Sequence, residues 1–240
     1  MNLLKLHFRY LFGKRNIILM AAVFMIAGVS FLLATRPFNS HTDHLINGKS
    51  YFQNYFSNCL LLTRILQVLL LSFVMGMSFT PPCDSYHILY LSYRRMRLPY
   101  YLSKLFLLLL VAIFICMLFC FLYFSIGFLS APWFIFRINQ LEAFINLSLL
   151  SLYYGLCSSL LVFLIKSPLS SVIAYIIYMT SEFLQSLMVS DVNTYIQLVF
   201  PSLIVAPEGF KLAYGPLHVL VLIGLAFLLG SYLYSRFDLT

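Results

Sequence analysis

Long stretches that are almost free of charged residues constrain the fold of this chain more than any other feature. Residues 17–35, for example, are 19 consecutive positions without a charged side chain, and a helix needs about 20 mostly apolar residues to cross a bilayer. We expect six membrane-spanning helices, at residues 17–35, 59–79, 102–128, 141–165, 169–188 and 216–234. The predicted fold is all-α, a polytopic membrane protein in which residues 1–240 form a single transmembrane domain.

The composition agrees with this prediction. The chain is 62% hydrophobic and only 9% charged, whereas a soluble domain carries about 25% charged residues. In a soluble protein a net charge of +8 would suggest a nucleic-acid partner. Here lysines and arginines retained on the cytoplasmic side of a membrane explain the charge, so we expect membrane lipid and no nucleic acid as a partner.

The distribution of Lys and Arg predicts the orientation, because cytoplasmic loops carry an excess of these residues. An even number of spans places both termini on one side, together with the loop between the second and third spans. That side carries Lys5, Arg9, Lys14, Arg15, Arg94, Arg95, Arg97, Lys104, Lys166 and Arg236. The opposite side carries Arg36, Lys49, Arg137 and Lys211. We therefore expect a multi-pass protein of the plasma membrane with both termini in the cytoplasm.

Three further segments lie outside the predicted spans. Residues 1–16 mix apolar and basic positions near helical spacing, which is typical of an interfacial helix. Residues 36–58 are polar and are predicted to form an outer loop with one short surface helix. Residues 189–215 are less regular, and the apolar run 196–206 within them is too short to cross. We expect that run to be a broken or re-entrant piece, covered by protein or water.

The loop between the second and third spans has the pattern of a short helix. Pro81 and Pro82 stop the preceding span, because proline lacks the amide donor and restricts the residue before it. Asp84 or Ser85 can cap a new helix, which would end before Pro99. The loop is interpreted either as a basic segment that sets topology or as a docking helix for a second protein. The residues expected to dock are Asp84, Tyr86, Ile88, Leu89, Tyr90, Leu91, Arg94, Arg95 and Arg97.

Motifs for catalysis are missing from the sequence. It contains no Gly-rich phosphate loop, no His-Glu-x-x-His and no Gly-x-Ser-x-Gly. Five cysteines have no metal-binding spacing, and His41 and His44 beside Asp43 are weak evidence for a metal site. We expect no catalytic residues, no metal and no cofactor in this chain. Active transport by it would need energy from another subunit or from an ion gradient.

Polar residues inside the second and fifth spans are predicted to line a translocation path. They are Arg64, Gln67, Tyr175, Tyr178, Glu182 and Gln185. Arg64 and Glu182 each lie five or six residues from the outer end of the predicted span, about 8–9 Å deep. A charge in lipid costs at least about 2.5–3.5 kcal/mol on insertion scales, and an ion pair would relieve both. The alternative is that Arg64 reaches the outer surface alone and Glu182 is hydrated.

This layout resembles the membrane subunit of ABC-2-type, or type V exporter-like, ABC transporters. The resemblance covers the interfacial N-terminal helix, the six spans, the loop helix and the irregular segment before the last span. The run from Arg97 to Lys104 (RLPYYLSK) is similar to the family's basic residue, Pro or Ser, then Tyr-Leu-x-x-Lys entering the third span. The family's Gly-rich stretch earlier in this loop is absent, and only Asp84 stands for its acidic residue.

The resemblance implies that the loop helix is a coupling helix, which docks in a separate cytoplasmic ABC ATPase holding ATP and Mg²⁺. The N-terminal helix would pack beside it. Two permease chains, either two copies or one chain and a related permease, would form a path between their first, second and fifth spans. The solute would be amphipathic, such as a peptide, antibiotic or lipid-linked glycan, as in peptide or bacteriocin export and immunity.

Two other functions stay open. A secondary transporter driven by an ion gradient would need ionisable residues near the membrane midplane and usually inverted repeats. A non-transporting accessory subunit of an ABC complex would share the same composition.

Overall fold

The computed structural model describes residues 7–8, 11–35, 48–79, 97–130, 134–165, 167, 169–187, 191–206 and 209–236. These ranges form seven helices and one two-stranded hairpin. In chain order the elements are α2 (Lys14–Ala34), α3 (Gly48–Ser78), α5 (Arg97–Ser130), α6 (Ile138–Ile165), α7 (Ser170–Leu187), α8 (Asp191–Val199), β1 (Leu203–Ala206), β2 (Gly209–Leu212) and α9 (Gly215–Arg236).

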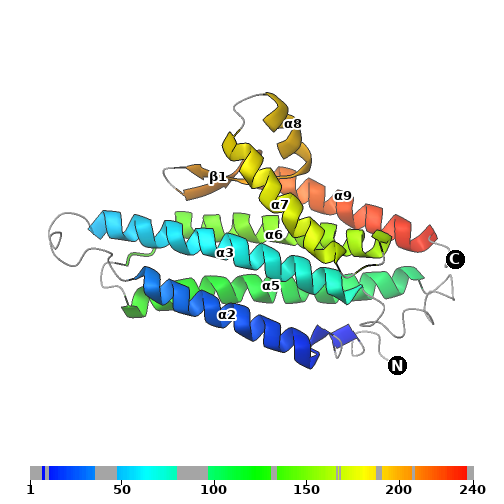
Figure 1. Ribbon diagram of the computed structural model, residues 1–240, viewed down its shortest axis with the longest axis horizontal. Coiled ribbons are helices and arrows are strands. Elements are labelled where there is room, and N and C mark those ends of the chain that lie inside the picture. Colours follow the sequence, from blue (N-terminus) through cyan, green and yellow to red (C-terminus); the bar gives the residue numbers. More distant parts are fainter. Residues whose placement is uncertain are drawn as a thin grey trace.

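Five of these helices, α2, α3, α5, α6 and α9, are long and apolar enough to cross a membrane. They run side by side along the long axis, with α7 tilted across them and α8 and the hairpin protruding on one side (Figure 1). The architecture is that of a helical, multi-pass membrane protein. The predicted fifth span corresponds to α7, whose apolar part, Ser170–Leu184, is shorter than the other five, so six spans remain a prediction.

The second span starts earlier than predicted, because α3 is one continuous helix from Gly48. Its first turns replace the last part of the expected polar loop. Tyr55 and Phe56 are buried there, and the Tyr55 ring stacks on Tyr123 of α5 with 5.2 Å between centroids. The Tyr55 hydroxyl also donates to the Tyr123 carbonyl at 2.9 Å. These contacts with the end of α5 stabilise the extra turns.

The third span also begins earlier than expected, at Arg97. Pro99 was predicted to stop a helix, but it lies in the first turn of α5, where the missing amide leaves no helical hydrogen bond unmade. Arg97 was expected in the loop, and its side chain is instead buried at the start of α5. The rest of the predicted coupling helix lies outside the described residues.

The predicted re-entrant run 196–206 is two different elements, the end of α8 and strand β1. β1 pairs with β2 in antiparallel register, with Leu203 opposite Leu212 and Ala206 opposite Gly209. Leu203 and Leu212 are buried in one hydrophobic cluster with residues of α3, α5 and α6. The chain therefore differs from the all-α prediction by one short hairpin, held against the bundle by its leucines.

Aromatic rings gather where α3 ends, α5 begins and α9 ends. The Tyr234 ring stacks on Tyr101 at 4.7 Å and on Phe163 at 4.5 Å, and Phe79 lies 5.9 Å from Tyr101. The four rings come from α9, α5, α6 and the residue after α3. They fix one end of the bundle, where α3 and α9 end and α5 begins (Figure 1).

Candidate functional site

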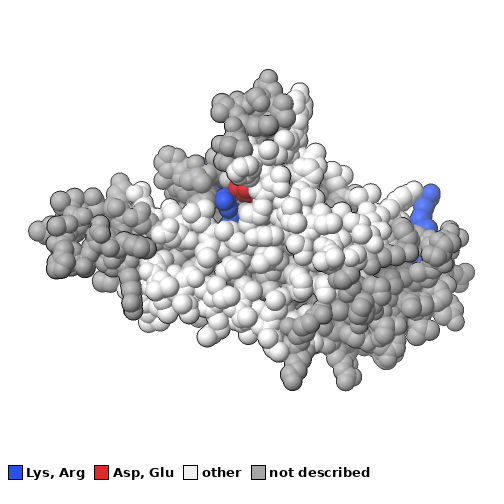
Figure 2. All heavy atoms as spheres, in the orientation of Figure 1, with Lys and Arg blue, Asp and Glu red and all other residues white. Residues whose placement is uncertain are grey.

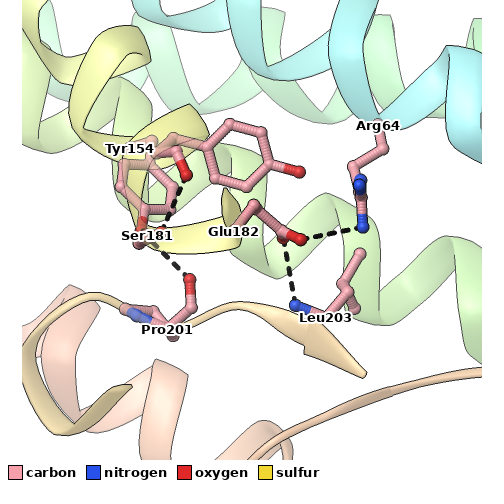
Figure 3. Close-up of polar contacts among 7 residues, drawn as sticks. Arg64, Tyr154, Ser181, Glu182, Pro201 and Leu203 are labelled. Carbon is pink, nitrogen blue, oxygen red and sulfur yellow. Dashed lines mark hydrogen bonds and ion pairs between the residues drawn. The ribbon is translucent and has the colours of Figure 1, made fainter. Parts of the chain in front are cut away.

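The predicted ion pair is present. Arg64 Nη1 of α3 lies 2.9 Å from Glu182 Oε2 of α7, and the two side chains point toward each other across the gap between these helices (Figure 3). The side chains are only 18% and 10% exposed. A charge so shielded inside a membrane protein needs a partner of opposite sign, and each residue supplies it to the other.

The hairpin supplies a second contact to the carboxylate group of Glu182. The backbone N–H of Leu203, at the start of β1, donates to Glu182 Oε1 at 3.2 Å (Figure 3). Both oxygens of Glu182 are thus engaged, one by a cation on α3 and the other by the backbone of the hairpin. Because a charge-assisted hydrogen bond is stronger than a neutral one, Glu182 ties three separate elements together.

Two adjacent tyrosines of α6 hold the segment just before β1. The Tyr154 hydroxyl lies 3.0 Å from the Pro201 carbonyl, to which it donates, and 3.3 Å from the Ser181 hydroxyl (Figure 3). The Tyr153 hydroxyl donates to the carbonyl of Val199 at 2.7 Å. These bonds satisfy the carbonyl groups of Val199, the last residue of α8, and of Pro201, two residues before β1. The hairpin is therefore anchored to α6 as well as to α7.

The positions of Arg64 and Glu182 along their helices can be compared with the prediction. The apolar part of α3 begins at Tyr55, so Arg64 is nine residues, or about 14 Å, from that end. The predicted depth of about 8–9 Å counted from residue 59, and it stays a prediction. Glu182 lies five residues before the end of α7 at Leu187, close to the predicted position.

The pair nevertheless reaches the molecular surface. Figure 2 shows basic and acidic atoms side by side in a recess at the foot of the protruding part. On the same helices Leu61 and Ile65 flank Arg64, Phe183 follows Glu182, and all three apolar side chains are exposed. Exposed apolar side chains therefore lie close in sequence to both charged residues.

The other predicted path residues lie in different places. Gln67 is fully buried, and its amide group donates to Cys116 Sγ at 2.8 Å and Ser151 Oγ at 3.0 Å. It therefore joins α3 to α5 and α6 inside the bundle and does not extend a polar stripe along the surface. Tyr178 is buried and interacts electrostatically with both charges of the pair. Tyr175 is half-buried, 6.4 Å from the Tyr178 ring. The side chain of Gln185 lies outside the described residues.

Three hydrogen-bond donors near the pair have no hydrogen-bond partner among the described residues. They are Nε of Arg64 and the hydroxyls of Tyr178 and Ser202, and all three atoms are buried. Ser202 directly precedes Leu203, whose N–H contacts Glu182. The site therefore has more donors than its single carboxylate uses.

Sequence reasoning missed the contributions of Leu203, Tyr153 and Tyr154. The Leu203 contact is made by a backbone amide, which any residue except proline could supply, so side-chain chemistry gave no signal for it. A signal for the hairpin was present: Pro207 and Glu208 separate two short apolar segments, the spacing of a two-residue hairpin loop. The paired tyrosines of α6 could have been recognised as interhelical donors.

Of the nine residues predicted to dock a second protein, the structure describes only one. All except Arg97 lie outside the described residues. Among the described residues, no group of three or more His, Cys, Asp or Glu side chains could hold a metal ion.

The chain matches no known protein-family model, and no curated protein is significantly similar to it in sequence.

Proposed function

We propose that this chain is the membrane-spanning permease subunit of an ATP-driven ABC exporter. Two permease chains form the path for an amphipathic solute such as a peptide or antibiotic. A separate ABC ATPase binds at the cytoplasmic face, where both termini and the loop between α3 and α5 lie. ATP hydrolysis on that partner tilts the spans through the loop.

One observation carries the proposal: the N-terminal segment packs on the first turns of α5, where the α3–α5 loop re-enters the bundle. The rings of His7 and Tyr100 meet edge to face with centroids 4.8 Å apart, and both are buried. Leu11 belongs to the same hydrophobic cluster as Tyr100 and Tyr101. A connecting helix beside a coupling helix needs this proximity, because force applied to the loop must reach both the first and the third span.

The buried ammonium group of Lys104, at the same end of the bundle, supports the same proposal. Lys104 Nζ lies 4.5 Å from the centre of the Phe79 ring and 5.6 Å from that of Tyr100. Cation–π contacts of this kind contribute about 0.5–2 kcal/mol, the larger values when desolvated. Lys104 therefore links Phe79, the residue that follows α3, to the first turns of α5.

The test is co-expression with a candidate ABC ATPase from the same genome. Replacing Tyr90 and Leu91 by Asp should abolish co-purification of the ATPase while the chain still inserts into the membrane. Arg236→Asp, at the exposed end of α9 on the same side of the bundle, is the control and should leave co-purification intact. Normal ATPase binding and transport by the Tyr90/Leu91 variant would refute the proposal.

The position of Arg64 favours a second candidate, an ion-coupled secondary transporter. Its depth in α3 brings an ionisable pair nearer the middle of the helix, where such transporters place their coupling sites. In proteoliposomes the two functions differ in energy source. Uptake that follows a proton or sodium gradient without ATPase would favour the second candidate, and strict dependence on ATP and the partner would favour the first.

A further inference from the structure

We propose that Arg64 and the backbone N–H of Leu203 form a binding site for the carboxylate group of an amphipathic solute, and that Glu182 occupies this site in the structure as an internal substitute. The inference rests on the proposed function, since it assigns a chemical class to the transported solute. Binding of the solute carboxylate releases Glu182 from Arg64, and with it the contact between α3 and α7.

The first argument is the convergence of two donors on one carboxylate. Arg64 Nη1 and Leu203 N–H come from a transmembrane helix and a hairpin, and they contact different oxygens of Glu182, at 2.9 and 3.2 Å. This is the arrangement by which proteins hold a ligand carboxylate, with a guanidinium on one oxygen and an amide on the other. A second carboxylate of the same geometry can replace that of Glu182.

The second argument is the balance of donors and acceptors. Arg64 Nε and Ser202 Oγ are buried without a partner among the described residues, whereas both oxygens of Glu182 are engaged. A buried donor left without an acceptor destabilises the structure, because it has lost its hydrogen bonds to water. An incoming anion brings acceptor oxygens to a site rich in donors, whereas an incoming cation brings none. The imbalance therefore selects a negatively charged group.

The third argument is the surface around the pair. The recess in Figure 2 exposes part of both charged residues. Leu61, one turn before Arg64 on the same face of α3, is exposed, as are Ile65 and Phe183, which follow Arg64 and Glu182 in the sequence. A molecule that places a carboxylate on Arg64 can lay an apolar chain along these side chains. The site thus fits an acidic head joined to an apolar body.

Exchange of carboxylates explains how binding could move α7. Arg64 keeps a partner of opposite sign throughout, so its burial stays compensated. Glu182 loses its partner and must reach water, since an unpaired carboxylate is costly in a shielded position. Because Glu182 also holds Leu203, its departure loosens the contact between α7 and the hairpin.

The inference can be tested on the purified chain without any ATPase, in a neutral maltoside detergent. The probes are dodecanoate, dodecyl phosphate and dodecyltrimethylammonium, which share one chain length and differ in head group. Binding is measured from the rise in thermal unfolding temperature with probe concentration. Dodecanoate should bind the wild-type chain, and E182Q should lower its Kd about tenfold, because the internal competitor is gone.

Variants of Arg64 provide the converse measurement. R64Q should abolish dodecanoate binding. The double variant R64Q/E182Q, which leaves no charge unpaired, should also fail to bind and guards against a result due to misfolding of R64Q alone. Glu142→Gln, at an exposed position of α6, is the matched control and should keep the wild-type Kd.

Several outcomes would overturn the inference. An equal Kd for dodecanoate in wild type and E182Q would show that Glu182 is no competitor. Tighter binding of dodecyl phosphate would assign the site to a lipid headgroup, and tighter binding of dodecyltrimethylammonium would reverse its sign. If any of these three binding results is obtained with a chain that carries out ATP-driven transport, the carboxylate site is wrong and the proposed function stands. If dodecanoate binds as expected but no ATPase co-purifies with the chain, the proposed function is wrong and the carboxylate site stands.

Discussion

Ser158 on α6 donates its hydroxyl to the backbone carbonyl of Ser72 on α3, at 2.6 Å. The same hydroxyl lies 3.3 Å from the carbonyl of Ser171 in the first turn of α7. Gly76 allows this approach, because a β-carbon there would lie 2.6 Å from the β-carbon of Ser171. Small residues let membrane helices pack closely, so α7 is fixed at its first turn by serines and glycine and near its other end by Glu182.

Gly76→Ala should destabilise the protein by about 1–3 kcal/mol, the usual cost of overpacking a tight contact. The new methyl group would collide with the Ser158 hydroxyl and with the α- and β-carbons of Ser171, and a change of rotamer cannot move these two carbons. Gly28→Ala on α2 is the control, since no atom lies within 4 Å of a β-carbon at that position. Thermal unfolding in detergent measures both. A lower unfolding temperature for the control than for Gly76→Ala would contradict the packing argument.

Arg64→Ala and Glu182→Ala should each lower stability by about 3–5 kcal/mol, because either change leaves the opposite charge shielded and unpaired. The double variant should lose less than the sum of the two. A double-mutant cycle on unfolding in detergent, repeated on transport, measures the coupling. Strict additivity would mean that water or headgroups satisfy each charge separately.

Tyr154→Phe should loosen the segment before β1 while leaving the ring packing in place. The substitution removes the hydrogen bond to the Pro201 carbonyl but keeps the contact with the Tyr178 ring, 5.0 Å away. The expected cost is about 0.5–1.5 kcal/mol, seen as faster amide hydrogen exchange in β1 and β2. Tyr195→Phe, at an exposed position of α8, should leave that exchange unchanged. Equal rates in the two variants would rule out the anchoring role.

The active complex should contain two permease chains. A single bundle of this size encloses little space for a large amphipathic solute, and two chains facing each other could form a path between them. Light scattering of the purified complex with its ATPase should give two permease chains per particle. Transport by particles that contain one permease chain would contradict this expectation.

Sequence reasoning predicted the long apolar helices and the ion pair for good physical reasons. Lipid offers the backbone no hydrogen-bond partner, so long apolar runs must be helical, and two opposite charges in such runs tend to meet. The same reasoning wrongly predicted that Gln67 lines the path. The spacing of three residues indicates that Gln67 and Arg64 share a face of α3, but it does not indicate which neighbouring helix the Gln67 side chain contacts. Cys116 and Ser151, its partners, lie on two other helices.

The start of α3 and the hairpin were missed for a different reason. The turns before Tyr55 contain Asn and Gln residues, so hydropathy ends the span there, although aromatic contacts with α5 continue the helix. The hairpin depends on main-chain pairing and on two leucines that reach the bundle. Local composition records neither of these tertiary contacts.

The length of α7 has a consequence for the surrounding lipid. With 18 residues, α7 is about 27 Å long, whereas a bilayer's hydrocarbon core is about 30 Å thick. Its tilt against the long helices shortens its reach further (Figure 1). A helix shorter than the core draws the headgroups inward, at a cost of a fraction of a kcal/mol per Å of mismatch. If α7 crosses the membrane as predicted, the bilayer would be thinnest where α3 meets α7, and the acyl-chain length of the host lipid would set how far the recess lies from water.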